Sequence, residues 1–202
     1  MARYTGPKNK LNRKIGEDLG VKTNALKIAR RLTIKPGQHG ARGRRKLSDY
    51  AVQLKEKQKV KYIYGILEKQ LHRLYDQANR QTTSTGATLL SLLERRLDNV
   101  VYRLGWAPTR AAARQLVAHN HVRVNDKKMN IPSYTVKPQE IITLTKRASK
   151  IPIVADQLKQ KEGSSVEWLD QKAGVGKVVR LPVKKDIKEI IDEQLVVEYY
   201  SR

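Results

Sequence analysis

An excess of positive charge over residues 1–154 is the strongest constraint on what this chain can fold into and bind. The 202 residues include 42 Lys and Arg against 19 Asp and Glu, a net charge of +23. Residues 1–90 carry 21 basic and 6 acidic side chains, residues 91–154 carry 12 and 4, and residues 155–202 carry nine of each. Self-repulsion on this scale opposes compaction, and nucleic acid is the commonest polyanion that offsets it. The neutral C-terminal segment is expected to serve packing.

Composition argues against several other classes of protein. Hydrophobic residues make up 39% of the chain, below the usual share of about 45–50%, so we expect a modest, divided core. No apolar stretch approaches the roughly 20 residues that span a bilayer, and the first residues contain no apolar signal region. We therefore expect a soluble, intracellular protein. The absence of cysteine excludes disulfides, a thiolate nucleophile and cysteine-ligated zinc.

The four histidines give little basis for a metal site. His119 and His121 are two residues apart, which on a strand would place both side chains on one face. Hydrogen bonding to phosphate or ribose is the interpretation that we favour for this pair over metal ligation. We accordingly predict no metal and no cofactor.

The first 47 residues lack sustained hydrophobic periodicity and are rich in Lys and Arg. Their last part, KPGQHGARGRRK from Lys35 to Lys46, is broken by glycine and proline, so it is predicted to be a loop. Two interpretations stay open for this basic arm in the free protein. It is either disordered, as charged arms often are, or ordered, and we expect it to order when it binds RNA.

A helix is predicted to begin after Ser48, which can cap it, with Asp49 in its first turn. Apolar residues then recur at intervals of three and four, which indicates one buried face: Val60, Ile63, Leu67, Leu71 and Leu74. The lysines of this region fall mostly off that face and are expected to point outward. The polar stretch from Gln81 to Gly86 marks a boundary.

The central segment predicts a helix–turn–helix–strand unit. Its first helix has one apolar face, formed by Leu92, Leu93, Leu97, Val100, Val101 and Leu104. Gly105 is expected to end that helix, and Thr109 to cap the next. Residues 122–125 alternate as a strand does, with a turn at residues 125–126. Further strands are expected at residues 134–136 and 141–145, separated by a turn at residues 138–140.

Arg110 and Arg114 are four residues apart, so the second helix should present both guanidinium groups on one face. Each can form paired hydrogen bonds to phosphate oxygens. The alternative is a surface of salt bridges. That alternative fits poorly, because residues 109–128 contain one acid, Asp126, against five Lys and Arg. We therefore predict RNA contact on this face.

Several collinear stretches resemble the family of the fourth small-subunit ribosomal protein, the S-four family. They are LERRLDNVVYRLGWAPTRAAARQLVAHNHVRVNDKKMNIPSY at residues 93–134, KPGQHG followed by LSDYAVQLKEKQKVKYIYGILEKQ at residues 35–40 and 47–70, the opening ARYTGPK, and the closing EQLVVEYYSR at residues 193–202. The central stretch alone would be a weaker sign, because pseudouridine synthases, a tRNA synthetase and a heat-shock protein carry a similar module.

The resemblance implies a fold class of α+β, in which a mainly helical domain formed by the N-terminal and C-terminal segments encloses an inserted α/β RNA-binding domain with a small antiparallel sheet. It also implies a structural component of the small ribosomal subunit. Members of the family bind a multi-helix junction of small-subunit ribosomal RNA early and help to nucleate assembly of the subunit body. They contact the fifth small-subunit protein near the messenger entry path, where the interface affects decoding accuracy.

The chain departs from the family pattern at three places. Many bacterial relatives hold zinc with four cysteines in the N-terminal arm, whereas this chain has none. The turn usually formed by Asn-Gly is Asn125-Asp126, and the turn usually containing Gly-Asp is Gln139-Glu140. Both replacements suit turns. We expect a zinc-independent member of the family.

Four segments are expected: a basic arm at residues 1–47, a helical domain at residues 48–91, an RNA-binding domain at residues 92–154, and residues 155–202 packing back on the helical domain. Isoleucines 187, 190 and 191, at helical spacing, would mediate that packing. The predicted RNA-binding residues are polar or basic and come from the arm, the first helix and the central unit. They are Arg3, Lys8, Lys10, Arg13, Lys14, Lys35, Gln38, His39, Arg42, Arg44, Arg45, Lys46, Lys55, Lys59, Arg95, Arg96, Arg103, Thr109, Arg110, Arg114, Gln115, His119, His121, Arg123, Asn125, Lys127 and Lys128.

Two other classes of function compete with the ribosomal one. An RNA-modifying enzyme would need a separate catalytic domain around a shaped pocket. Residues 155–202 are too few for one, so we predict no enzymatic activity. A stand-alone RNA chaperone or regulator would bind many RNAs with little discrimination. We expect location in a cytoplasmic ribosome, with an organellar ribosome as the open alternative, and no membrane or small-molecule partner. The nucleotides contacted, the source organism and repression of the chain's own messenger stay open.

Overall fold

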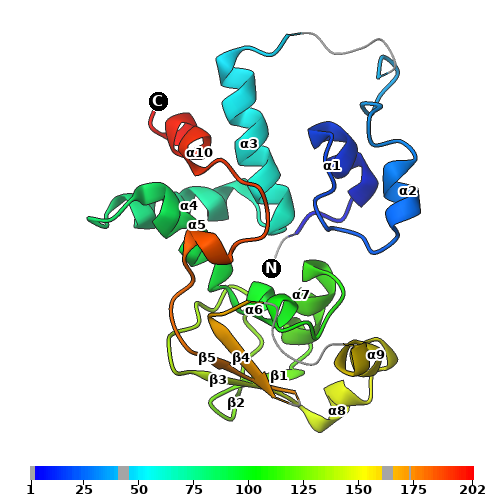
Figure 1. Cartoon of the computed structure of the whole chain (residues 1–202), viewed down its shortest axis with the longest axis vertical. Helices are drawn as coiled ribbons and strands as arrows, with labels where there is room; N and C mark the ends of the chain where they lie inside the picture. Colours follow the sequence, from blue (N-terminus) through cyan, green and yellow to red (C-terminus); the bar gives the residue numbers. More distant parts are fainter. Residues whose placement is uncertain (1–2, 41–45, 161–165, 173) are drawn as a thin grey trace. The chain divides into compact units, whose positions relative to one another are not determined.

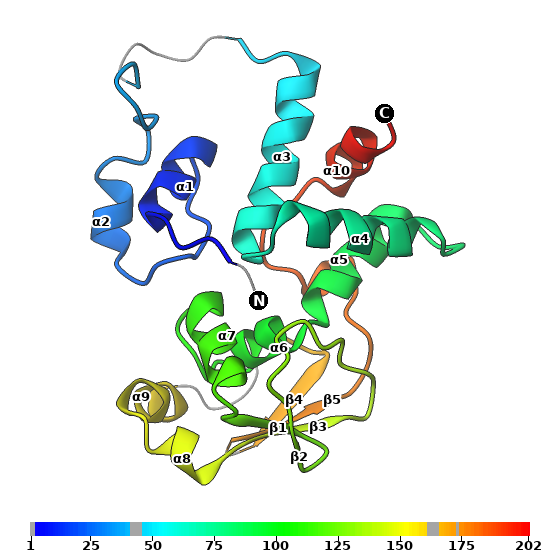
Figure 2. The same ribbon diagram turned by 180° about the vertical axis from the view of Figure 1, so that it is seen from behind.

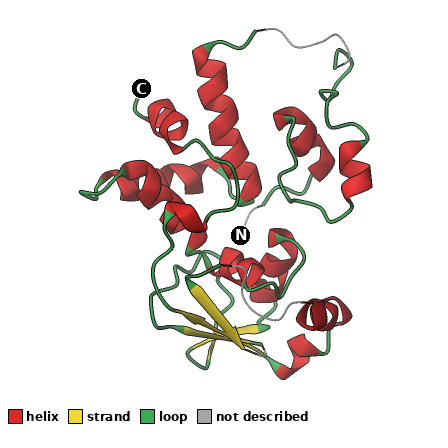
Figure 3. Ribbon diagram, in the orientation of Figure 1, coloured by secondary structure: helices red, strands yellow, loops and turns green. Residues whose placement is uncertain are grey.

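The computed structural model describes residues 3–40, 46–160, 166–172 and 174–202. The chain folds into two compact units, one formed by residues 1–86 and 190–202 and the other by residues 87–189 (Figures 1 and 2). The first unit is helical, and the second combines helices with a five-stranded antiparallel sheet (Figure 3). The predicted α+β fold, with an α/β domain inserted into a helical one, is confirmed.

The first unit is built around helix α3 (Asp49–Ile63), which Ser48 caps as predicted, since its hydroxyl accepts from the Ala51 amide. The other helices of this unit are α1 (Lys8–Ile15), α2 (Ala25–Ala29), α4 (Glu68–Asn79) and α10 (Glu193–Tyr200). Helix α10 lies beside α3, and the amide of Gln53 donates to the Glu198 carboxylate at 2.9 Å. Tyr200, at the end of α10, donates to Glu68 at 2.8 Å. These contacts hold the C-terminal helix against α3 and α4.

The basic arm contains two helices for which no prediction was made, α1 and α2, and they bury Leu11, Ile15 and Ile28. Two expectations for the first unit are wrong. The apolar stripe after Ser48 is divided between α3 and α4, because Gly65 adopts a left-handed φ of 61° and ends the first helix. Two lysines expected on the outer surface, Lys57 and Lys59, are buried.

The second unit begins within α5 (Thr85–Glu94) and continues through two helices and two short strands. These are α6 (Leu97–Arg103), α7 (Arg110–Ala118), β1 (Val122–Val124) and β2 (Lys127–Lys128). Strand β3 (Ile141–Leu144) precedes the short helices α8 (Lys146–Ser149) and α9 (Pro152–Gln160). Strands β4 (Leu169–Lys172) and β5 (Val175–Val178) and a 3-10 turn at Lys184–Asp186 complete the unit.

The strands lie in the order β2-β1-β3-β5-β4, all antiparallel. Helices α6 and α7 lie on one side of this sheet (Figures 1 and 2). The core between them includes Val101 of α6 and Leu104 directly after it, Val117 of α7, Ile142 of β3 and the fully buried Trp168. Strand β1 has only three residues, but its side chains alternate between the two faces of the sheet. Val122 and Val124 therefore both point into the core and are buried.

Several predictions made from the sequence for the second unit are wrong. The first central helix is interrupted at Arg95 and Arg96, and Arg96 instead forms a bridge with Thr135. That bridge is the only pairing made by the expected strand at residues 134–136, within the described part of the chain. Residues 155–202 do not act as one segment, because residues up to 189 supply α9, β4 and β5 to the second unit. Ile190, expected to pack, is 88% exposed.

Candidate nucleic-acid interface

The turn between α6 and α7 forms as its residues predict. Gly105 ends α6 in a left-handed conformation, with φ of 74°, which an L side chain would adopt only with strain. The Thr109 hydroxyl then accepts from the Ala112 amide at 3.3 Å and caps α7. This turn fixes the direction of α7, and with it the positions of Arg110 and Arg114.

Four arginines of this region form a buried arginine cluster, defined here as Arg96, Arg103, Arg110 and Arg114. Each is no more than 8% exposed. Arg103 forms a bidentate pair with Glu94, with distances of 2.9 and 2.7 Å. Arg96 pairs in the same way with Asp98, at 3.1 and 2.8 Å. These pairs hold α5, α6 and the turn between them together.

Acidic residues from outside α7 also neutralise its arginines. Asp98 of α6 accepts from Arg114 at 3.2 Å. Glu189, at the far end of the unit's sequence, accepts from both Arg103 and Arg110. Burial raises the pKa of Glu189, but the guanidinium groups of Arg110 and Arg103 outweigh burial and lower that pKa to about 2. Burial lowers the pKa of Arg103, and the Glu94 and Glu189 carboxylates raise it above its usual range.

The prediction of an open cationic face at Arg110 and Arg114 is therefore corrected. The local count of acids suggested that salt bridges were too few, but Asp98 and Glu189 lie outside the segment counted. These arginines stabilise the fold, so replacing both by alanine is not expected to leave the fold intact. Arg95 also makes a structural contact, because its Nε donates to the Val136 carbonyl at 3.0 Å.

The hairpin of β1 and β2 follows α7 and is shaped by its turn. Asn125 and Asp126 have φ of 47° and 62°, so both central residues are left-handed, as a two-residue hairpin turn requires. The Asn125 side-chain oxygen accepts from the Ile141 amide at 2.9 Å and ties this turn to β3. Asn125, one of the predicted RNA-binding residues, thus has a structural contact.

Strand β3 brings a distant segment beside the start of β1. Val122 pairs with Leu144, so the residues after β3 lie next to those before β1. The Thr145 amide donates to the His121 carbonyl at 3.0 Å. This register places the dibasic pair Lys146-Arg147 alongside the two histidines.

The result is a groove of about 690 Å³, called the basic groove here. Its lining comes from the α7–β1 connection, the hairpin, β3 and the start of α8: His119, Asn120, His121, Arg123, Lys128, Thr143, Leu144, Thr145, Lys146 and Arg147. In the part of the chain that the structure describes, no Asp or Glu lines it. Lys128, Lys146 and Arg147 are exposed.

The basic groove can bind a polyanion with little reorganisation. Its four cationic side chains come from the antiparallel strands β1 and β2 and from helix α8, so the backbone fixes their spacing. Arg123 is partly buried, and its Nε atom lacks a hydrogen-bond partner among the described residues. Guanidinium and ammonium groups in such a groove supply the donors that phosphate oxygens accept.

The structure brings four predicted residues together in this groove: His119, His121, Arg123 and Lys128. It adds Lys146 and Arg147, which the sequence prediction missed. The signal that could have found them is a pair of adjacent basic residues directly after a strand. Two further predicted residues lie close by in the sequence, since Gln115 is exposed on α7 and Lys127 is exposed on β2.

The predicted residues of the first unit differ in their surroundings. Arg13 donates to the carbonyls of Ile34 and Lys35, at 2.8 and 3.1 Å, and so positions the KPGQHG loop. Lys59 pairs with Glu17 at 2.7 Å and is buried. Other predicted residues are exposed: Arg3, Lys10, Lys14, Gln38, His39 and Lys46. Lys8, Lys35 and Lys55 are partly exposed, and Arg42, Arg44 and Arg45 lie outside the described residues.

Other kinds of site find little support in the described ranges. They contain no group of three or more His, Asp and Glu arranged to hold a metal ion. None of their helices is long and apolar enough to cross a membrane.

Known proteins resemble this chain along its whole length. A family model described as the ribosomal protein S4/S9 N-terminal domain matches residues 3–94, and one described as the S4 domain matches residues 95–142. The small ribosomal subunit protein uS4 of Parabacteroides distasonis is 50% identical over 204 residues, and that of Chloroflexus aurantiacus is 49% identical over 208 residues. Both alignments cover 100% of each chain.

Proposed function

Because this chain belongs to the uS4 family of small-subunit ribosomal proteins, we propose that it binds small-subunit ribosomal RNA through the basic groove and the exposed basic residues of its first unit. The buried arginine cluster is left out of this interface. Its charges are already neutralised by Glu94, Asp98 and Glu189.

The observation that carries the proposal is a groove whose charged lining is entirely basic among the described residues. Each Lys or Arg that meets a phosphate releases condensed counterions, so binding gains free energy with every contact. By the estimate for duplex DNA, a protein that makes about 6–10 such contacts loses roughly 10³- to 10⁵-fold in affinity between 50 and 200 mM salt. Single-stranded segments would weaken that dependence.

The proposed role also includes a part in subunit assembly and in decoding. We propose that the chain joins the RNA first among its neighbours, helps to nucleate the body of the subunit, and contacts the fifth small-subunit protein near the messenger entry path. Through that contact it would contribute to decoding accuracy in a cytoplasmic ribosome. Leaving the chain out of subunit reconstitution should then block incorporation of later proteins.

A filter-binding experiment tests the RNA specificity. The full chain is titrated with small-subunit ribosomal RNA and with an unrelated structured RNA of equal length, at the same salt concentration. The proposal predicts tighter binding to the ribosomal RNA by at least about 10³-fold, the lower end for specific nucleic-acid binders. Equal affinities would favour the stand-alone RNA chaperone.

A pair of variants tests the place of binding. The double substitution Lys146→Ala with Arg147→Ala removes two charges from the basic groove. Lys185→Ala with Lys188→Ala removes two exposed charges of the same unit that do not line it. Only the first pair should weaken binding to the ribosomal RNA. A larger loss for the second pair would place the interface elsewhere.

A further inference from the structure

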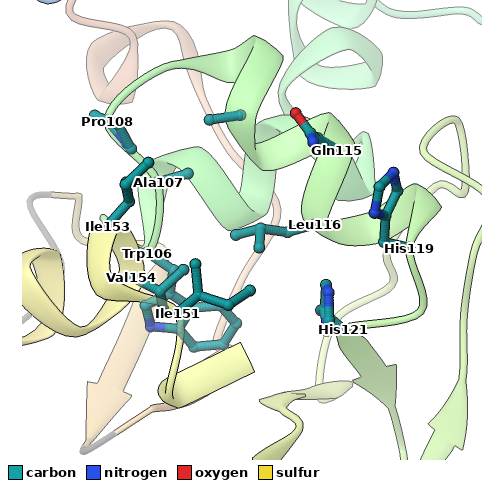
Figure 4. Close-up of a pocket in the computed structure, with 11 residues that line it drawn as sticks. Trp106, Ala107, Pro108, Gln115, Leu116, His119, His121, Ile151, Ile153 and Val154 are labelled. Carbon is teal, nitrogen blue, oxygen red and sulfur yellow. The ribbon is translucent and has the colours of Figure 1, made fainter. Parts of the chain in front are cut away.

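A second cavity, of about 160 Å³, opens next to the basic groove. Figure 4 shows its walls, which come from the α6–α7 turn, one face of α7 and the start of α9. Trp106 and Val154 are buried in these walls, and Ile153 is 59% exposed at the edge. Most of the lining is apolar, and this cavity is called the ring pocket here.

The volume of the ring pocket fits one small aromatic ring system. An apolar cavity of about 150 Å³ inside a protein holds a single benzene molecule. Drug-sized ligands require about 300–1,000 Å³, so a larger cofactor would not be enclosed. The occupant is therefore a single planar group presented by something larger that lies outside.

Two polar side chains at the pocket suit a nucleobase. Gln115 and His119 line it and are exposed, and Figure 4 shows Gln115 on α7 and His119 at the end of that helix. An amide offers a donor and an acceptor, which match the hydrogen-bonding edge of a base. An imidazole ring stacks on unpaired bases, and sequence-specific RNA recognition mostly uses such splayed-out bases.

The ring pocket and the basic groove share two lining residues. His119 and His121 line both, so an occupant of the groove passes directly beside the pocket. The groove is lined by Arg123, Lys128, Lys146 and Arg147, which suit a phosphate backbone. A nucleotide fits this arrangement because it carries a ring for the pocket and a phosphate for these four cations.

We propose that the ring pocket receives one unstacked base of the RNA whose backbone lies in the basic groove. This inference rests on the proposed function, because it requires RNA in that groove. It adds a means of reading sequence or local structure to a surface that otherwise contacts only backbone. The base enters between Ile153 and His119, with Gln115 at its polar edge, and the buried Trp106 lies within the pocket wall.

Two short probes separate the base from the backbone. One is a single-stranded hexanucleotide of adenylate, and the other is the same ribose-phosphate chain without bases. The full chain is titrated with each, and tryptophan fluorescence is recorded. Of the two tryptophans of the chain, Trp106 lines the pocket and Trp168 does not, so a Trp168→Phe background isolates the relevant signal.

The adenylate probe should bind about 5-fold or more tightly than the baseless probe, the effect of stacking one base. It should also change Trp106 fluorescence, whereas the baseless probe should not. The double substitution Gln115→Ala with Ile153→Ala should abolish this difference without weakening the baseless probe. Ile131→Ala is the matched control, because Ile131 is 49% exposed in the same unit and lies outside the pocket.

The outcomes distinguish this inference from the proposed function. Equal binding of both probes, each weakened by Lys146→Ala with Arg147→Ala, would overturn the base pocket and leave the basic groove as an RNA site. Binding unaffected by those groove substitutions would remove the basis of both. A base-dependent affinity that survives Gln115→Ala with Ile153→Ala would place base stacking elsewhere and overturn the inference.

Discussion

The arginine cluster and the basic groove lie in the same unit and carry the same kind of charge, but only the cluster is neutralised within the protein. Arg103 and Arg110 are buried against Glu189, with Glu94 as a further partner of Arg103. Lys146 and Arg147 are exposed, and no acid lines their groove among the described residues. A basic residue therefore indicates a nucleic-acid contact only when the fold brings it no carboxylate.

The difference also separates stability from binding. A buried pair is costly to break, because removing one partner leaves an unpaired charge in a medium of low dielectric constant. An exposed cation contributes little to stability, but it remains available to phosphate. Substitutions in the cluster should thus change unfolding, and substitutions in the groove should change RNA affinity.

The largest effect is expected for Arg103→Ala. This change leaves Glu94 and Glu189 without their shared partner, so the free energy of unfolding should fall by about 3–5 kcal/mol. Urea titration followed by tryptophan fluorescence measures it for the second unit, because Trp106 and Trp168 both belong to its core.

Arg147→Ala provides the control for that experiment. It also removes one arginine from the same unit, but from an exposed position, so the free energy of unfolding should change by no more than about 0.5 kcal/mol. Similar losses for Arg103→Ala and Arg147→Ala would remove the distinction between the cluster and the groove.

The second-largest effect on stability is expected at low pH, where Glu189 becomes protonated. Its pKa falls from 4.5 to about 2 on folding. Its ionised form therefore stabilises the fold fully above pH 4.5, and this contribution is lost as the pH falls through about 2. The contribution is about 3 kcal/mol at most, from the size of the shift.

Thermal unfolding between pH 2 and 6 measures this contribution by comparing the wild-type chain with Glu189→Gln. The wild-type advantage should be largest near pH 6 and disappear near pH 2. The comparison between the two chains isolates Glu189, because other carboxylates titrate in both. A difference in Tm that stays constant with pH would show that Glu189 is not held ionised by the arginines.

A smaller effect is expected from the groove, and it should appear in binding only. For Lys146→Ala with Arg147→Ala, the slope of log affinity against log salt should lose about 1–2 in magnitude, since each lost phosphate contact contributes about 0.7–0.9. Affinity for small-subunit ribosomal RNA measured by filter binding over a salt series gives this slope. An unchanged slope would mean that these two side chains meet no phosphate.

The smallest effect is expected at the hairpin turn. Asp126 has φ of 62°, so Asp126→Gly relieves backbone strain while adding entropy to the unfolded chain. The free energy of unfolding should rise by a few tenths to about 1 kcal/mol, and RNA affinity should stay within about twofold. Urea titration and filter binding check the two values, and a large change in affinity would show that the turn itself contacts RNA.

Local signals in the sequence predicted the fold well where a single residue decides the backbone. Ser48 and Thr109 cap their helices, and Gly105 ends α6, as their chemistry requires. The breaks at Gly65 and at Arg95–Arg96 were missed, because the apolar spacing continues across both. The pairing of β4 with β5 and of β5 with β3 was also missed, since a four-residue strand such as Val175–Val178 carries little periodicity.

The candidate site was only partly predictable for a related reason. His119, His121, Arg123 and Lys128 are close in the sequence, and a short unit could be recognised around them. Which arginines are neutralised depends on contacts across long stretches of chain, such as Arg103 with Glu189, 86 residues away. No local count of acids can detect such a pair, so the sequence predicts open arginines where the structure has them paired with carboxylates.

Chemical labelling of lysines tests the central claim most directly. The full chain is acetylated with a water-soluble reagent, with and without small-subunit ribosomal RNA, and the modification of each lysine is measured by mass spectrometry. RNA should protect Lys128 and Lys146 of the basic groove and leave the exposed Lys185 and Lys188 reactive. If bound RNA leaves Lys128 and Lys146 as reactive as in the free chain, the basic groove is not where ribosomal RNA binds.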